Sequence, residues 1–109
     1  MNRVGRPAGI PWQDVGLGQR RKVCAYNADE MAVMVDFETG AVGALHSHPH
    51  TQISYVLSGE FTYEIEGETW HLNCGDSIVV DGGKTHGCTC VKAGMLLDVF
   101  TPMREGFIS

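Results

Sequence analysis

Residues 43–59 read Gly-Ala-Leu-His-Ser-His-Pro-His-Thr-Gln-Ile-Ser-Tyr-Val-Leu-Ser-Gly and contain three of the chain's five histidines. Successive side chains of an extended chain point to opposite faces, so His46 and His48 project from the same side. Neutral imidazole is a common ligand of zinc, nickel, copper and iron ions. The His-x-His spacing therefore predicts two imidazoles that bind one metal ion.

Two further side chains belong to the same expected site. Pro49 cannot continue an inner strand, so the chain is expected to turn at Pro49 and His50 before a new strand begins at Gln52. Gln52 then lies close to the imidazoles as a candidate third ligand; a polar strand end that faces water is the alternative. His86 follows a glycine-rich turn at 81–85 and can reach the pair across a rolled sheet.

The composition describes a small acidic chain with a folded core. At 109 residues it is shorter than a typical domain, so one domain with one core is expected. Hydrophobic residues make up 43% of the chain, and 14 glycines against 4 prolines favour many tight turns and an all-β fold. The net charge of -5, with no basic run, argues against nucleic acid as a partner.

Location and redox state follow from what the sequence lacks. No apolar stretch approaches the roughly 20 residues that cross a bilayer, and residues 1–11 do not resemble a secretory signal. We therefore expect a cytoplasmic protein with no membrane partner. The four cysteines show no Cys-x-x-Cys spacing and are expected to be reduced thiols.

Turn signals recur about every 8 to 12 residues, which is typical of a β-sandwich or barrel. Gly59-Glu60 is expected to close a hairpin between two strands. Residues 1–18 are rich in glycine and proline and predict an irregular N-terminal arm, followed by a barrel domain at 19–109. Trp12 is expected to anchor the arm to the barrel or to a partner subunit. The predicted strands cover 19–26, 31–37, 52–57, 61–65, 70–72, 77–80 and 95–100.

Several residues near the expected site are interpreted as structural. Cys88 and Cys90 share the parity of His86, so each is a small buried filler or, alternatively, a thiolate ligand. His50 is expected to lie exposed on its turn or beside the ligands. Three aromatic residues are expected in the core rather than as a platform for substrate: Tyr55, Tyr63 and Trp70.

Two motifs resemble those of the cupin superfamily. Residues 43–59 resemble the first motif and residues 75–90 resemble the second. The matching positions are His46, His48, Gln52 and Gly59 in the first, and Gly75, Gly83 and His86 in the second. The departures are Gln52 at a position that is usually Glu, Asp81 at a usual proline and Cys90 at a usual asparagine. The resemblance implies a double-stranded β-helix, or jelly-roll barrel, of two antiparallel sheets with a metal ion inside.

Nearly the whole chain from about Pro11 is similar to the KdgF family of pectin-degradation cupins. The residues that carry this similarity are Lys22-Val23, the run 31–37, the histidine stretch and the ending 96–107. The resemblance implies a metal-dependent isomerase-type enzyme that opens 4,5-unsaturated monouronates from pectin or alginate to the linear 5-keto-4-deoxyuronate.

The same resemblance implies the site residues. The metal ligands would be His46, His48, Gln52 and His86, holding one divalent ion of nickel, zinc, manganese or iron. Three imidazoles and one amide are all neutral, which leaves the charge of the ion uncompensated and suits Lewis-acid chemistry on an anionic substrate. The reacting side chains would be Asp98 as acid and base, Arg104 on the carboxylate and Phe100 as a pocket wall.

Other interpretations stay open at this point. A cupin dioxygenase would need a redox metal with open positions. A sugar-binding cupin without catalysis would use the same fold, because fold does not decide function. Asp98 could also serve only as an ion-pair partner of Arg104. The expected partners are a small anionic sugar acid and a second copy of the chain, with the arm around Trp12 packed across the homodimer contact.

Overall fold

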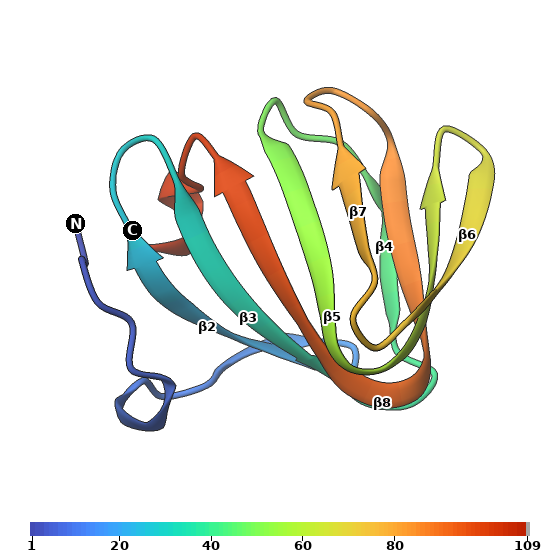
Figure 1. Ribbon diagram of the computed structural model, residues 1–109, viewed down its shortest axis with the longest axis horizontal. Helices are drawn as coiled ribbons and strands as arrows, with labels where there is room; N and C mark the ends of the chain where they lie inside the picture. The colour runs from blue at the N-terminus through green and yellow to red at the C-terminus, as the bar shows by residue number, and fades with distance from the viewer. Residues whose placement is uncertain (109) are drawn as a thin grey trace.

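The computed structural model describes residues 1–108. They form one antiparallel sheet that bends over on itself (Figure 1). Ser109, the last residue of the predicted barrel, lies outside the described residues. Two short 3-10 helices, η1 (Pro7–Gly9) and η2 (Glu105–Phe107), flank the sheet near its ends. The strands are β1 (Gln13–Gly16), β2 (Gln19–Tyr26), β3 (Met31–Phe37), β4 (Val42–His46), β5 (Thr51–Ile65), β6 (Glu68–Asn73), β7 (Ser77–Val80) and β8 (His86–Thr101).

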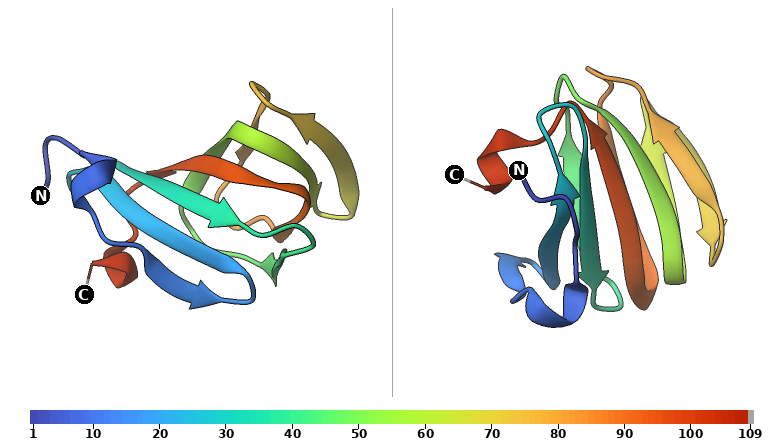
Figure 2. Two further views of the ribbon diagram at one scale, coloured as in Figure 1. Left: turned by 90° about the horizontal axis from the view of Figure 1, so that it is seen from below. Right: turned by 60° about the vertical axis from the view of Figure 1, so that its left-hand side comes forward.

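The two longest strands, β5 and β8, each run through both halves of the folded sheet (Figures 1 and 2). The first part of β5 pairs with the last part of β8, as Gln52 with Phe100, and the second part pairs with the start of β8, as Tyr63 with Cys88. Strands β1, β2, β3 and β7 extend one half, while β4 and β6 extend the other. The expected all-β jelly roll is confirmed.

Gly59 lies inside β5, where the strand bends. Its φ of 81° is in the left-handed region, and a Cβ there would lie 2.5 Å from the Lys92 carbonyl oxygen of β8. The pairing register with β8 also shifts between Ser58 and Phe61, as at a β-bulge. The hairpin predicted at Gly59-Glu60 is therefore wrong, because both flanking segments belong to one bent strand.

The N-terminal arm is partly ordered on β2. Gln13–Gly16 form strand β1, so the expected irregular segment contains a strand. The ring of Trp12 lies 4.4 Å from the Arg20 guanidinium carbon and 4.5 Å from the Lys22 nitrogen, both on β2. These cation–π contacts hold the arm on its own barrel.

Strand β5 turns alternate side chains into the core, and the core differs in part from the sequence expectation. Ser54 and Val56 are fully buried, whereas Ile53 and Leu57 point outward and are partly exposed. Phe37 and Phe61 meet edge to face inside the fold with ring centres 5.1 Å apart. Among the three aromatic residues expected in the core, only one is buried: Tyr63, whereas Tyr55 and Trp70 are 41% and 40% exposed.

The described residues also bear on two other expectations. All four cysteines are free thiols, as expected. Within residues 1–108, no helix has the length and apolar character needed to cross a membrane.

Candidate metal centre

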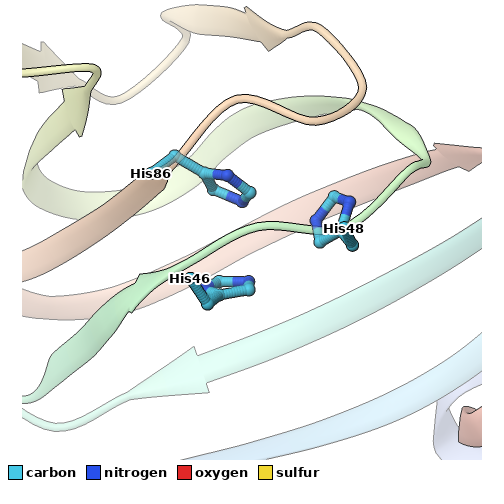
Figure 3. A group of neighbouring side chains, drawn as sticks. All are labelled: His46, His48 and His86. Atoms are coloured by element: carbon cyan, nitrogen blue, oxygen red, sulfur yellow. The ribbon is translucent and has the colours of Figure 1, made fainter.

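The rings of His46, His48 and His86 lie close together (Figure 3). One ligand atom from each ring lies within 4.8 Å of the other two. His46 ends β4 directly opposite His86, which begins β8, and His48 follows in the loop before β5. The expectation that the His-x-His pair meets a third histidine from the later motif is confirmed.

Two loops lock together to bring His48 and His86 to the same place. The backbone N–H of Gly83 donates to the His48 carbonyl oxygen at 2.8 Å. A Cβ on Gly82 would collide with the Pro49 carbonyl oxygen, so only glycine permits this approach. The glycine-rich turn before His86 therefore packs on the turn that follows His48.

Hydrogen bonds fix the orientation of the three rings. Each Nδ1–H donates to a backbone carbonyl oxygen two residues away: His46 to Ala44 at 2.8 Å, His48 to His50 at 3.0 Å and His86 to Lys84 at 2.9 Å. A carbonyl oxygen can only accept, so the proton of each neutral ring sits on Nδ1 and the lone pair sits on Nε2. Outer hydrogen bonds of this kind orient histidine ligands of metals.

The free Nε2 atoms fit a cation. The Nε2 of His86 is buried and has no hydrogen-bond partner among residues 1–108. The Nε2 of His48 faces the Gln52 side-chain oxygen at 3.0 Å, and both are acceptors, a pair that a cation satisfies. Burial, together with the charge of Arg104, lowers the pKa of both His48 and His86. The His48 and His86 rings are therefore neutral donors of the kind that a divalent transition metal requires.

A buried polar network connects Gln52 to Asp98. The Gln52 amide nitrogen donates to the Ser54 hydroxyl at 3.0 Å and to the Tyr63 hydroxyl at 3.0 Å. The Ser54 hydroxyl donates to Asp98 Oδ1 at 2.6 Å. Sequence reasoning did not identify Ser54 and treated Tyr63 only as core. The sequence did contain a signal for Ser54. It lies two residues after Gln52 on the same strand, so both side chains point to the same face.

Asp98 is a buried acid with a perturbed pKa. It faces inward with Phe100, two residues further along β8, as expected. Burial raises its pKa to about 6, against the opposing effects of its hydrogen bonds and of Arg104. Within residues 1–108 it forms no ion pair with Arg104, so the alternative of a direct Asp98–Arg104 pair is not what the structure contains.

A pocket of about 320 Å³ opens beside the histidines. Arg104 lies just after β8, with its guanidinium carbon 5.1 Å from the centre of the Phe100 ring. The His48 ring packs against the same phenylalanine at 5.8 Å. The structure thus brings all seven residues singled out from the sequence into one region. Six of them line the pocket itself: His46, Gln52, His86, Asp98, Phe100 and Arg104.

The remaining neighbours have supporting places. Cys88 also lines the pocket, but burial raises the pKa of its thiol to about 12, so it is a neutral thiol rather than a thiolate. Cys90 is fully buried, in keeping with a core filler. His50 is half-buried beside the ligands and supplies the carbonyl that holds the His48 ring.

The bent antiparallel sheet with histidines gathered inside it defines a cupin. The chain belongs to the cupin family, because residues 33–100 match the family described as Cupin domain. It is 39% identical over 100 residues to the "Pectin degradation protein KdgF" of Dickeya dadantii (strain 3937), a match that covers 90% of this chain and 91% of the relative. The expected similarity to the KdgF family is therefore confirmed.

Two solved structures are similar over almost the whole chain. KdgF from Halomonas sp. is 39% identical with a TM-score of 0.92, covering 95% of this chain and 98% of the other. An RmlC-like cupin from Shewanella frigidimarina NCIMB 400 is 36% identical with a TM-score of 0.94, covering 98% and 96%.

Proposed function

We propose that this protein is an isomerase-type enzyme that converts 4,5-unsaturated monouronates, released from pectin or alginate, into the linear 5-keto-4-deoxyuronate. The observation that carries the proposal is Asp98, a buried carboxyl group in the same pocket as the imidazoles and the Arg104 guanidinium. Similarity to the pectin degradation protein KdgF supports a sugar acid from pectin as the substrate class.

Asp98 would perform the proton transfers. The substrate is a cyclic enol ether with a hemiacetal at C1. Asp98 takes the proton of the C1 hydroxyl while the bond from C1 to the ring oxygen breaks, which leaves an aldehyde at C1 and an enolate at C5. Asp98 then gives the proton to C4, and C5 becomes a ketone. No atom is gained or lost, and a positioned acid–base group contributes roughly 10² to 10⁴ in rate.

The other groups would bind and orient the substrate. A divalent ion such as nickel, zinc, manganese or iron, held by His46, His48, Gln52 and His86, would supply Lewis-acid stabilisation of negative oxygen. Arg104 carries a planar fork of donors that matches a carboxylate bidentately. Phe100, which contacts both the His48 ring and Arg104, would form a wall of the substrate pocket.

Loss of the C4=C5 ultraviolet absorbance, after mixing with unsaturated monouronate, tests the reaction directly. We expect turnover by protein that carries about one divalent ion per chain, without a need for oxygen. The variant His48→Ala with His86→Ala should lose both metal and activity. His71→Ala is the matched control, because His71 is exposed on β6 and contacts Glu60 away from the pocket.

Each failure has its own meaning. Stoichiometric metal in the double variant would refute the ligand assignment. A metal-loaded protein that binds uronate tightly without turnover would be a binding cupin. Turnover that requires oxygen and a redox metal would make the protein a cupin dioxygenase instead.

A further inference from the structure

Arg21 shares the pocket with Arg104, although no motif singled it out. Both residues line the 320 Å³ pocket together with Phe107. The Arg21 guanidinium carbon lies 3.8 Å from the centre of the Phe107 ring, and that of Arg104 lies 4.5 Å from the same centre. The Phe107 ring, at the end of η2, thus contacts two guanidinium groups that come from opposite ends of the chain.

Among the described residues, these two charges have no carboxylate partner. Within residues 1–108 neither Arg21 nor Arg104 forms an ion pair, and the Arg21 Nε donates instead to the neutral Gln13 side chain at 3.1 Å. Acids are not scarce, because the chain has 13 Asp and Glu against 8 Lys and Arg. The strand neighbour Arg20 contacts Asp36 on the outer face at 2.9 Å. The lack of an acid at Arg21 is therefore a feature of the pocket and not of the composition.

Two like charges close together in a partly desolvated place repel each other. Burial lowers the pKa of Arg21, and burial together with the charge of Arg21 lowers the pKa of Arg104. Asp98 attracts Arg104 from beyond ion-pair distance, whereas among residues 1–108 no acid raises the pKa of Arg21. A bound anion between the guanidiniums removes this repulsion and adds charge-assisted hydrogen bonds.

We propose that Arg21 is a second substrate-binding residue, which together with Arg104 binds the carboxylate of the sugar acid and selects acidic sugars over neutral ones. This inference rests on the proposed function for the identity of the acid. Gln13 and Phe107 are positioning residues, because one holds the Arg21 Nε and the other packs on its guanidinium. Strands β1 and β2 therefore supply specificity to a site whose metal ligands come from other parts of the chain.

The test compares Arg21→Gln with Arg20→Gln, which makes the same change of charge on the adjacent residue but on the outer face. Steady-state kinetics with unsaturated monouronate should give a KM raised at least about ten-fold in Arg21→Gln, with kcat within about three-fold, since a lost charged hydrogen bond weakens binding by roughly that factor. Calorimetry with saturated galacturonate should show the same loss of affinity. Galactose should bind equally to both variants, and Arg20→Gln should match wild type.

Arg21→Lys provides a second variant if Arg21→Gln does not fold. It keeps the charge but loses the fork, so it should also weaken the acid at unchanged kcat. One outcome would overturn the inference and leave the proposed function intact. In it, the wild type turns over the unsaturated acid, and the folded Arg21 variants have the same KM and the same affinity for galacturonate as the wild type. Galacturonate binding that depends on Arg21, with no turnover of the unsaturated acid, would support the inference and refute the proposed reaction. An absence of Arg21-dependent binding of either acid would overturn the inference.

Discussion

Gln52 explains how the pocket keeps a single carboxylate. Its amide nitrogen donates to the hydroxyls of Ser54 and Tyr63, so the one hydrogen of Ser54 remains for Asp98. A glutamate at position 52 has no hydrogen to donate when ionised and would compete with Asp98 for the same hydroxyl. Two carboxylates around one hydroxyl also repel each other. The amide therefore leaves Asp98 as the one acid among the described pocket residues.

Asp98→Asn separates acid–base function from shape. We expect kcat to fall by roughly 10² or more with metal content unchanged, because the amide cannot accept the proton of the C1 hydroxyl. Asp36→Asn is the control, since Asp36 lies on neighbouring β3 and pairs with Arg20 outside the pocket. Near wild-type turnover by folded Asp98→Asn would remove the assigned role of Asp98.

The same substitution is expected to stabilise the metal-free fold. The folded state raises the Asp98 pKa from 3.8 to about 6, so it binds this proton more tightly than the unfolded chain does. Ionisation of Asp98 therefore lowers the free energy of unfolding. This loss is absent below pH 4 and complete above pH 6, where it amounts to about 3 kcal/mol. Urea unfolding in the presence of a chelator should show the gain at neutral pH and its decline as the pH falls from 6 towards 4. An equal gain at every pH would contradict this cause.

The bend of β5 and β8 closes the sheet around an interior. Gly59 and Gly94 face each other there, and a Cβ on Gly94 would collide with the Ser58 carbonyl oxygen. Close approach of the two backbones lets each strand continue into the second half of the sheet. His86 and Asp98, at the two ends of β8, are thereby turned into the same interior.

Gly59→Ala should destabilise the fold far more than Gly67→Ala. Both glycines have φ near the left-handed region, 81° and 84°, which costs alanine about 1–2 kcal/mol. Only at Gly59 does the new Cβ meet backbone, 2.5 Å from the Lys92 oxygen, and such overpacking adds roughly 1–3 kcal/mol. A Cβ on Gly67 meets nothing within 4 Å. Equal losses of unfolding free energy in urea would show that the bend tolerates a side chain.

Local patterns predicted most of the strands, but they missed β1, β4 and the tertiary bend. The bounds of β2, β3 and β7 agree with the sequence, because alternation and turn residues are local signals. Gly59 gives the same local signal in a bulge as in a hairpin turn, so the hairpin prediction failed. For the site, the motifs predicted the histidines, and the resemblance to the KdgF family implied Asp98. They missed Ser54 and Arg21, whose partners lie far away in the sequence.

The two halves of the sheet have different outer faces, one apolar and the other polar. Ile53, Tyr55 and Leu57 of β5 lie outward beside Val79 of β7, and these four are between 38% and 54% exposed. Paired with them on the same face of β8 are Leu97 and Val99. The outer face of the other half of the sheet carries Thr62, Glu64, Thr69, His71 and Thr89. An exposed apolar patch of this kind indicates a protein contact.

We expect a second copy of the chain to cover this apolar face. Each copy carries a net charge of -5, so two copies repel each other. This repulsion is weakest when the contact is made by an uncharged face. In a two-fold dimer the apolar face would pack against its own copy, without contacts between like charges. The predicted homodimer contact through Trp12 is less favoured, since that ring already lies against Arg20 and Lys22 of its own β2.

Sedimentation of three variants distinguishes these surfaces. Val79→Glu places one charge on each of the two faces that meet in the expected dimer, and both charges would be buried there. If the wild type is a dimer at micromolar concentration, this variant should be a monomer. Thr69→Glu adds the same charge to the polar face and should leave the dimer intact. Dissociation by Trp12→Ala alone would locate the contact at the N-terminal arm instead, and a monomeric wild type would refute the dimer. Arg21 and Gln13, which contact each other, belong to the same chain. A monomer therefore contains both residues, and turnover per chain should be the same in monomer and dimer.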